Sequence, residues 1–381
     1  MITYSVKSKI SQRGAVDMIS FSTFVLIFTA ALLLLFTQRA NACTAITLNA
    51  EDGTAVQART QEWGAFDLDS DLMVTPRGIT IQSNTPDNKP GLKWKGKYGV
   101  LGINGIHMPI YIDGMNEKGL TVSVLYLPGM AEFEPYNPAH AHKSINPIDV
   151  PMWLLTNFAT TDEVRTKLPS VRVVGVLQKE LGGIAAPVHW LVTDKEGNTI
   201  VIEYTDKKMH IYDDPVGVLT NSPDFQWHLV NLRNYVGLQP QSRNPEKIGK
   251  LEVAPLGVGS GLIGLPGDFT PVSRFIRATA LRNTVRPLHS GDDAVQEAFR
   301  ILNSFDIPLG AVDSPAKDII GSTQWTTATD TNALLYYYRT QYNHRIRIVD
   351  LNKIDFTKGN KIRTQPLDQQ RKQDYQTVNI Q

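Results

Sequence analysis

Cys43 is the only cysteine of the 381-residue chain, and it directly follows Ala40-Asn41-Ala42. An A-x-A sequence at the end of an apolar run is typical of a signal peptidase cleavage site. A cut after Ala42 would give Cys43 both a free α-amine and a thiol. A thiolate attacks an amide carbonyl, and an α-amine with a reference pKa of about 7.7–8.0 can take the thiol proton. This position therefore predicts nucleophilic hydrolysis of an amide.

The same chemistry requires a cation near the sulfur, a group that orients the amine, and donors aimed at the developing oxyanion. It requires no metal or organic cofactor. An exported protein with one cysteine forms no intramolecular disulfide, so Cys43 is either a buried bystander or a reactive thiol. Its place at the predicted new N-terminus favours the reactive thiol.

Residues 1–42 have the pattern of an export signal, with a basic start and an apolar stretch over residues 19–36. We expect the signal to be removed, leaving an exported, periplasmic or secreted protein without a stable membrane span. An uncleaved anchor is one alternative, because an apolar stretch of roughly 18 residues is long enough to be considered as a membrane span. A lipoprotein signal is another, but Ala40 and Asn41 differ from the leucine-like and very small residues that such signals favour.

The charge balance limits the kinds of partner. The chain has 38 Lys and Arg against 37 Asp and Glu, a net charge of +1. Without a basic excess it has no electrostatic basis for binding nucleic acid. A hydrophobic content of 42% over this length supports a large core, in one domain or two.

Periodicity predicts the elements that must position these groups. Alternating and β-branched runs predict strands, including two hairpins and a C-terminal meander, over residues 43–48, 55–59, 121–127, 188–193, 199–204, 323–329, 334–340 and 345–351. Helical patterns cover residues 148–159, 225–235, 272–284 and 292–304. Strands, then helices, then strands indicate α+β layers. Residues 358–381 are polar, and we expect a flexible tail.

Several motifs follow Cys43 in a fixed order. They are Cys43-Thr44, Arg59-Thr60-Gln61-Glu62-Trp63, residues 113–120, 189–195, 217–223 and 264–268, Ser273-Arg274-Phe275 and Thr323-Gln324-Trp325. Together they resemble the choloylglycine hydrolase and penicillin V acylase family of N-terminal nucleophile hydrolases. The resemblance implies a four-layered αββα sandwich, a catalytic domain over residues 43–357 and linear amide hydrolysis. It therefore implies that the partner is a small-molecule N-acyl amide. It also implies a homo-oligomer, with a homotetramer as the expected state.

Site roles follow from the resemblance residue by residue. Cys43 resembles the nucleophile, and Arg59 resembles the arginine beside the sulfur. Asn221 resembles the side-chain oxyanion donor, and Tyr126 stands where the family supplies a second donor from its backbone amide. Arg274 resembles a second active-site arginine. The alternatives are ordinary ion pairs for the arginines and a turn position for Asn221.

Glu62 departs from the family pattern. The family usually has an aspartate at this position, three residues after the arginine, where it interacts with the amine of the nucleophile. Glutamate is one methylene longer. Either the pocket shifts to accept it, or Asp67 or Asp69 takes over the task.

Tyr126 bears on the substrate. The resemblance associates tyrosine at this position with penicillin V acylases and asparagine with bile salt hydrolases, so we predict a penicillin V acylase-like enzyme. The alternatives are a conjugated bile salt hydrolase, an N-acyl homoserine lactone acylase, or a non-catalytic, lipid-anchored binding protein on the same fold. Trp63, Phe66 and Met130 are candidates for lining an acyl pocket or for ordinary core packing.

Overall fold

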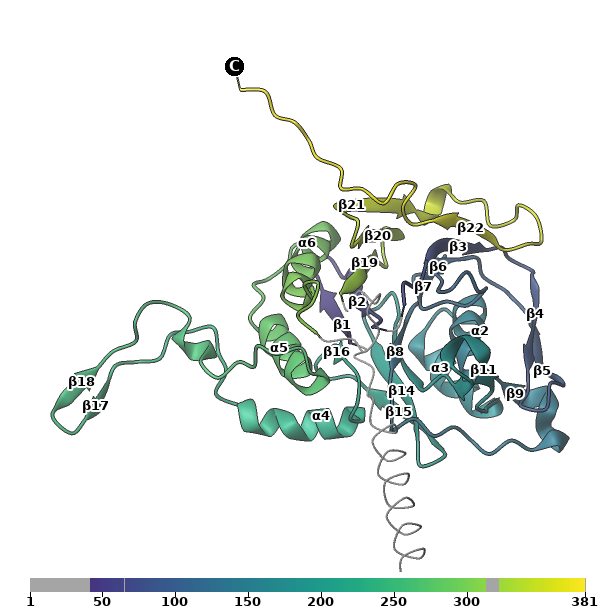
Figure 1. The fold of residues 1–381 in the computed structure, drawn as a ribbon, viewed down its shortest axis with the longest axis horizontal. Helices are drawn as coiled ribbons and strands as arrows, with labels where there is room; N and C mark the ends of the chain where they lie inside the picture. Colours follow the sequence, from purple (N-terminus) through teal and green to yellow (C-terminus); the bar gives the residue numbers. More distant parts are fainter. Residues whose placement is uncertain (1–41, 65, 313–321, 381) are drawn as a thin grey trace, which may run out of the picture.

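A computed structural model describes residues 42–64, 66–312 and 322–380, so the predicted signal peptide lies outside the described residues except for Ala42. Two antiparallel sheets carry most of the strands (Figure 1). The six-stranded sheet has the order β16 (Val218–Leu219), β1 (Cys43–Asn49), β2 (Ala55–Glu62), β19 (Thr323–Asp330), β20 (Leu335–Thr340), β21 (Asn343–Asp350). The eight-stranded sheet has the order β15 (Lys208–Asp213), β14 (Thr199–Thr205), β13 (Val188–Thr193), β8 (Thr121–Tyr126), β7 (Asp113–Asn116), β6 (Val100–Ile103), β3 (Asp71–Thr75), β22 (Arg363–Pro366).

Helices cover the outer face of each sheet. Helices α5 (Pro271–Asn283) and α6 (Gly291–Leu302) pack on β1 and β2 of the six-stranded sheet. Helices α2 (Val150–Asn157) and α3 (Thr161–Lys167) bury their apolar residues against the eight-stranded sheet. A third apolar cluster fills the space between the sheets. The four layers confirm the expected αββα sandwich.

The strongly periodic segments form the predicted elements. The strands β1 and β2 form the first predicted hairpin, and β13 and β14 form the second. The strands β19, β20 and β21 form the meander. Helix α4 (Phe225–Asn231) continues as a 3-10 turn to Tyr235. Ser290 caps α6 and forms a capping box with Asp293, as expected for a polar residue that satisfies free N–H groups at a helix start.

Smaller elements complete the chain. Two-stranded pairs are β4 (Thr80–Asn84) with β5 (Pro90–Lys95), β9 (Ser144–Ile145) with β10 (Arg172–Val173), β11 (Leu177–Gln178) with β12 (Ile184–Ala185), and β17 (Glu246–Ile248) with β18 (Leu251–Val253). In the described part of the chain, no helix is long and apolar enough to cross a bilayer. The β17–β18 pair lies at the end of an arm that projects far from the sandwich (Figure 1).

The polar C-terminal segment differs from the expectation of a flexible tail. Residues Arg363–Pro366 form β22, which pairs with β3 at the edge of the eight-stranded sheet. Leu367 is buried directly after this strand. The polar composition misled the prediction because an edge strand is held by backbone hydrogen bonds and needs few apolar side chains.

Candidate active site

The register of β1 and β2 decides which side chains meet. Cys43 lies opposite Gln61, and Ala45 lies opposite Arg59. Because side chains alternate between the two faces of a strand, Cys43, Arg59 and Gln61 point toward the eight-stranded sheet. Thr44 and Glu62 point to the opposite face, toward the helices. The site therefore uses both faces of the β1–β2 hairpin, at the end where Cys43 and Glu62 lie.

The Cys43 sulfur is enclosed in the structure. Its side chain is buried, with Sγ at 3.8 Å from Gln61 Oε1 and 4.0 Å from the Glu62 carbonyl oxygen. Burial raises the pKa of the Cys43 thiol, and the charge of Arg59 makes the largest opposing contribution. The thiol therefore needs a base to ionise, while Arg59 favours the thiolate once it forms.

Arg59 is buried, and within the described residues it donates hydrogen bonds to neutral acceptors. Its guanidinium donates to the carbonyls of Ile112 and Val124, and to Gln61 Oε1. It also lies over the Trp325 ring, 5.2 Å from the centroid. The guanidinium is thus held by carbonyls and a ring, an arrangement that differs from the ordinary ion pair considered above.

Asn221 and Arg274 converge on the backbone of Cys43 from separate elements. Asn221 follows β16, and its Oδ1 accepts from the Cys43 N–H at 2.9 Å and from Arg274 Nη2 at 2.6 Å. Arg274, on α5, also donates to the Cys43 carbonyl and, at 2.9 Å, to Thr44 Oγ1. Burial lowers the pKa of Arg274 to about 10. These bonds fix Cys43 at the start of β1.

Asn221 has a fixed amide orientation because Oδ1 faces two donors. Its Nδ2 donates to the Tyr126 carbonyl at 2.7 Å. Because a primary amide nitrogen carries two hydrogens, Nδ2 has a second donor besides the one bound to Tyr126. The side-chain amide of Asn221 and the backbone of Tyr126 therefore lie together beside Cys43, where a carbonyl oxygen under attack would develop negative charge.

Glu62 lies on the helix-facing side of the hairpin. Its Oε1 accepts from Thr323 Oγ1 at 2.7 Å, and its Oε2 is buried without a partner among the described residues. Burial raises the pKa of Glu62 to about 7, and Arg274 makes the largest opposing contribution. Glu62 therefore remains in the site, with one oxygen available.

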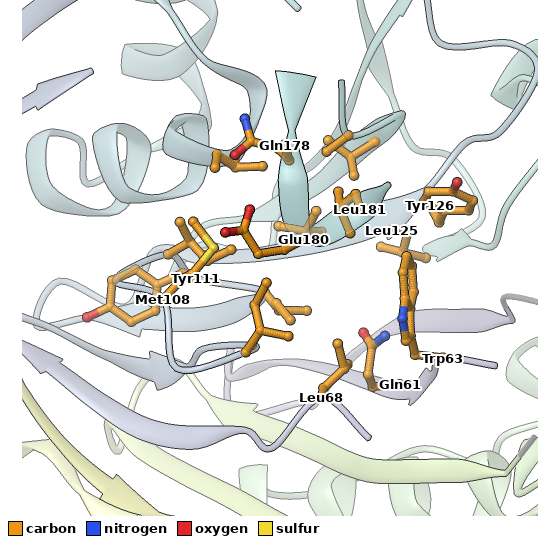
Figure 2. A pocket seen from close by; sticks show the side chains of 18 of the residues that line it. Gln61, Trp63, Leu68, Met108, Tyr111, Leu125, Tyr126, Gln178, Glu180 and Leu181 are labelled. Atoms are coloured by element: carbon orange, nitrogen blue, oxygen red, sulfur yellow. The ribbon is translucent and has the colours of Figure 1, made fainter. Parts of the chain in front are cut away.

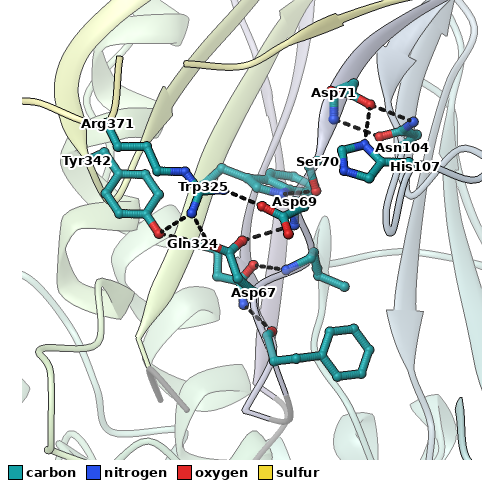
Figure 3. Close-up of polar contacts among 12 residues, drawn as sticks. Asp67, Asp69, Ser70, Asp71, Asn104, His107, Gln324, Trp325, Tyr342 and Arg371 are labelled. Carbon is teal, nitrogen blue, oxygen red and sulfur yellow. Dashed lines mark hydrogen bonds and ion pairs between the residues drawn. The ribbon is translucent and has the colours of Figure 1, made fainter. Parts of the chain in front are cut away.

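Asp67 and Asp69 are held elsewhere (Figure 3). Asp67 accepts from the Tyr342 hydroxyl at 2.7 Å and lies 3.3 Å from Arg371. Asp69 also pairs with Arg371. Because both carboxylates bind the segment after β22, neither replaces Glu62 in the structure.

Glu62→Gln is expected to change how stability depends on pH. An acid whose pKa rises from 4.5 in the unfolded chain to about 7 on folding destabilises the fold as pH rises through that interval. Wild type should therefore lose melting temperature relative to Glu62→Gln between about pH 4 and about pH 8. The exposed Glu196→Gln is the matched control and should follow wild type. If the melting temperatures of wild type and Glu62→Gln change with pH in parallel, burial does not raise the pKa of Glu62.

Cys43 is one of the residues that line an apolar pocket (Figure 2 shows other lining side chains). Its empty volume, including the part open to solvent, is about 830 Å³, within the usual range of small-molecule sites. Besides Cys43 and Gln61, its lining includes Trp63, Phe66, Leu68, Met108, Ile112, Leu125, Tyr126, Leu181 and Val188. Trp63 and Phe66 were predicted to line it, whereas Met130 is not among the lining residues. The pocket suits an apolar acyl group.

The sequence motifs include Gln61 and Gln324, but the sequence analysis assigned neither residue a role. Gln61 accepts from both Arg59 and Cys43 and lines the pocket. Gln324 Nε2 donates to the carbonyls of Trp63 and Phe66, and its Oε1 accepts from Leu68 N–H. Gln324 thus holds the chain that forms the pocket wall. The spacing of two between Arg59 and Gln61 was the available signal for a shared strand face.

The fold and the site define a class of protein. A four-layered αββα sandwich whose first inner strand begins with a buried cysteine has the architecture of the N-terminal nucleophile hydrolases. Residues 43–365 match the family described as linear amide C-N hydrolases, choloylglycine hydrolase family. The chain belongs to this family and is a hydrolase acting on carbon–nitrogen bonds of linear amides.

Individual relatives span most of the chain. A bile salt hydrolase/transferase from Clostridium perfringens is 33% identical over 327 residues, covering 84% of this chain and 96% of the relative. A penicillin V acylase from Pectobacterium atrosepticum is 27% identical over 319 residues, covering 79% and 78%. The crystal structure of a mutant conjugated bile acid hydrolase from Clostridium perfringens superimposes with a TM-score of 0.77 at 31% identity, covering 88% of this chain and all of that one.

Proposed function

We propose that the chain is exported, is cut before Cys43 and hydrolyses N-acyl amides with a large apolar acyl group, conjugated bile salts first among them. The observation that carries this proposal is the apolar pocket that Cys43 lines. Support for bile salts comes from the relative at 33% identity, compared with 27% for the penicillin V acylase. Support for the cut comes from the A-x-A sequence before Cys43 and from the family match, which begins at residue 43.

The proposed reaction has two steps. The α-amine of Cys43 takes the thiol proton, and the thiolate adds to the amide carbonyl. Asn221 Nδ2 and the Tyr126 N–H stabilise the resulting oxyanion, and Arg59 stabilises the thiolate. The C–N bond then breaks, and the α-ammonium gives its proton to the departing amine. Water, deprotonated by the same α-amine, hydrolyses the acyl thioester and releases the acid.

Penicillin V is the second candidate substrate, and Tyr126 favours it. The Tyr126 ring meets Trp63 edge to face at 5.4 Å between centroids, at the pocket wall. Two aromatic rings in this arrangement offer a slot for a third, such as a phenoxy ring. The sequence-based preference for a penicillin V acylase thus rests on this one position, while relatives of higher identity favour the bile salt alternative.

The test is amine release by the protein beginning at Cys43, with glycocholate, penicillin V and an N-acyl homoserine lactone assayed in parallel. Faster cleavage of glycocholate supports the lead proposal. Faster cleavage of penicillin V would make penicillin V the preferred substrate and leave the proposed enzyme class unchanged. No cleavage, together with a lipid-acylated Cys43 in the mass spectrum of the exported protein, supports the lipid-anchored binding protein.

We also propose that the protein is a homotetramer in which the projecting arm joins copies. The arm exposes Ile248, Leu251, Val253, Leu256 and Val258. A two-stranded pair has no core of its own, and clustered exposed apolar residues mark interaction surfaces. Light scattering is expected to give a tetramer mass for wild type and a smaller species for Leu251→Glu. Leu309→Glu, exposed outside the arm, should leave the mass unchanged. A monomeric wild type would contradict the proposal.

A further inference from the structure

Two buried histidines donate to consecutive carbonyls of the segment that carries Asn221. His189 Nε2 lies 2.9 Å from the Thr220 carbonyl oxygen, and His228 Nε2 lies 2.8 Å from the Asn221 carbonyl oxygen. Both histidines are fully buried. A carbonyl can only accept, so each Nε2 must carry a hydrogen. Neither histidine belongs to the reaction proposed above.

The His189 ring is oriented by a carboxylate. His189 lies on β13, and its Nδ1 is 2.7 Å from Glu203 Oε1 on β14. The two oxygens of Glu203 also accept from the Phe225 N–H, at 3.2 and 3.1 Å, where α4 begins. Glu203 therefore ties the eight-stranded sheet to α4 and fixes the direction of the His189 Nε2–H toward Thr220.

The His228 ring is oriented by stacking. It lies on α4 and stacks on the Phe275 ring, with 4.5 Å between centroids and 13° between planes. Phe275 directly follows Arg274 on α5. The His228 ring is thus held against α5, the helix that also carries Arg274. Its Nε2 is directed to the Asn221 carbonyl.

These bonds hold the backbone on both sides of the Asn221 Cα. With the carbonyls of Thr220 and Asn221 both bound, the peptide planes that flank this Cα are fixed, and the side chain leaves the backbone in one direction. Its amide then reaches Cys43, Tyr126 and Arg274 together. Catalytic groups lose about 10²-fold in rate when misplaced by about 1 Å.

We propose that His189 and His228 are positioning residues for Asn221, acting through the Thr220 and Asn221 carbonyls to aim its amide at the oxyanion. This inference rests on the proposed function, because it assigns Asn221 the role of oxyanion donor. A histidine that only stabilised the fold would affect every step and ligand alike, whereas a positioning residue acts only through Asn221.

The experiment compares His228→Phe with His228→Gln. Phenylalanine keeps a ring against Phe275 and loses the donor, while glutamine retains a donor near the Nε2 position. His228→Phe is expected to lower kcat by about 10- to 100-fold with KM little changed, and His228→Gln should recover most of the loss. The control is His210→Phe, on β15 beside Tyr212, which should match wild type.

Two further readouts separate positioning from stability. An aldehyde analogue of the acyl group adds the Cys43 thiol across its carbonyl, forming a C–S bond and moving the thiol proton to the oxygen, which then occupies the oxyanion position. His228→Phe should weaken binding of this aldehyde and leave binding of the product acid unchanged. In addition, Asn221→Ala is expected to cost about 10²–10³-fold in kcat. The double variant should be no slower than Asn221→Ala alone, because residues that act as a unit are not additive.

Additive losses in the double variant, or equal weakening of aldehyde and acid binding, would overturn the inference. His189→Gln, which keeps a donor toward Thr220 but loses Glu203, provides the same comparison if His228→Phe does not fold. If wild type hydrolyses the substrate and His228→Phe has the same kcat, the inference is rejected while the proposed function stands. Absence of any wild-type amide turnover rejects the proposed function, and the aldehyde comparison then decides the inference.

Discussion

Cys43→Ala is expected to abolish amide hydrolysis, lowering kcat by at least about 10⁴-fold. The variant removes the only thiol of the chain, and the described residues that line the pocket include no serine, threonine or lysine that could replace it. Loss of one sulfur from a buried site should cost only about 1 kcal/mol of stability, so the variant should still fold. The measurement is the rate of amine release from the preferred substrate, beside the melting temperature of each protein.

The single cysteine also permits a chemical version of this test. Iodoacetamide can alkylate only Cys43, so complete inactivation should accompany the labelling of one thiol per chain. Cys43→Ser is the matched variant, with a hydroxyl in place of the thiol and no reaction with iodoacetamide. Full turnover by Cys43→Ala, or by the alkylated protein, would remove Cys43 from the mechanism and favour a binding protein or a different nucleophile.

Retention of Ala42 is expected to reduce the rate by about 10²–10⁴-fold, the usual contribution of a general base. In the structure the Cys43 nitrogen is a peptide N–H that donates to Asn221 Oδ1, and an amide nitrogen cannot accept the thiol proton. Burial meanwhile raises the pKa of the thiol. Removal of Ala42 would supply a basic amine at this position.

Two recombinant forms test this prediction, one beginning at Cys43 and one that retains Ala40-Asn41-Ala42. Mass spectrometry establishes each N-terminus. Both forms contain the same pocket residues, so equal binding of the product acid is the control for correct folding. Equal turnover by the two forms would mean that another group takes the thiol proton. An increase in mass at Cys43 after export would instead identify the acylated amine of a lipoprotein.

Local periodicity explains why some strands were predicted and others were missed. The strands β1, β13 and β19 alternate or are rich in β-branched residues, and such patterns predict half-buried strands. The strand β7 has the sequence Asp113-Gly114-Met115-Asn116, which is typical of a turn. It is a buried strand because Asp113 accepts from the hydroxyls of Ser123, Thr327 and Tyr336. Those partners lie on three other strands and leave no local signal.

The sequence by itself was enough to predict the family and the layered fold, and it nominated Cys43 as the nucleophile. The signals were a lone cysteine after A-x-A and a series of short motifs in a fixed order. Each of these signals consists of residues that are close together in the chain. The predicted strand over residues 55–59 ended before Gln61, so the shared face of Arg59 and Gln61 became clear only when the structure extended this strand to Glu62.

Only the tertiary structure decided how the site is assembled. Asn221 and Arg274 lie 178 and 231 residues from Cys43 in the chain, and they meet it because the loop after β16 and helix α5 pack against β1. The segment after β22 binds Asp67 and Asp69 through Arg371, whereas Glu62 stays in the site. The physical reason is that burial and hydrogen bonding between layers depend on three-dimensional neighbours, whereas sequence patterns report only on residues close along the chain.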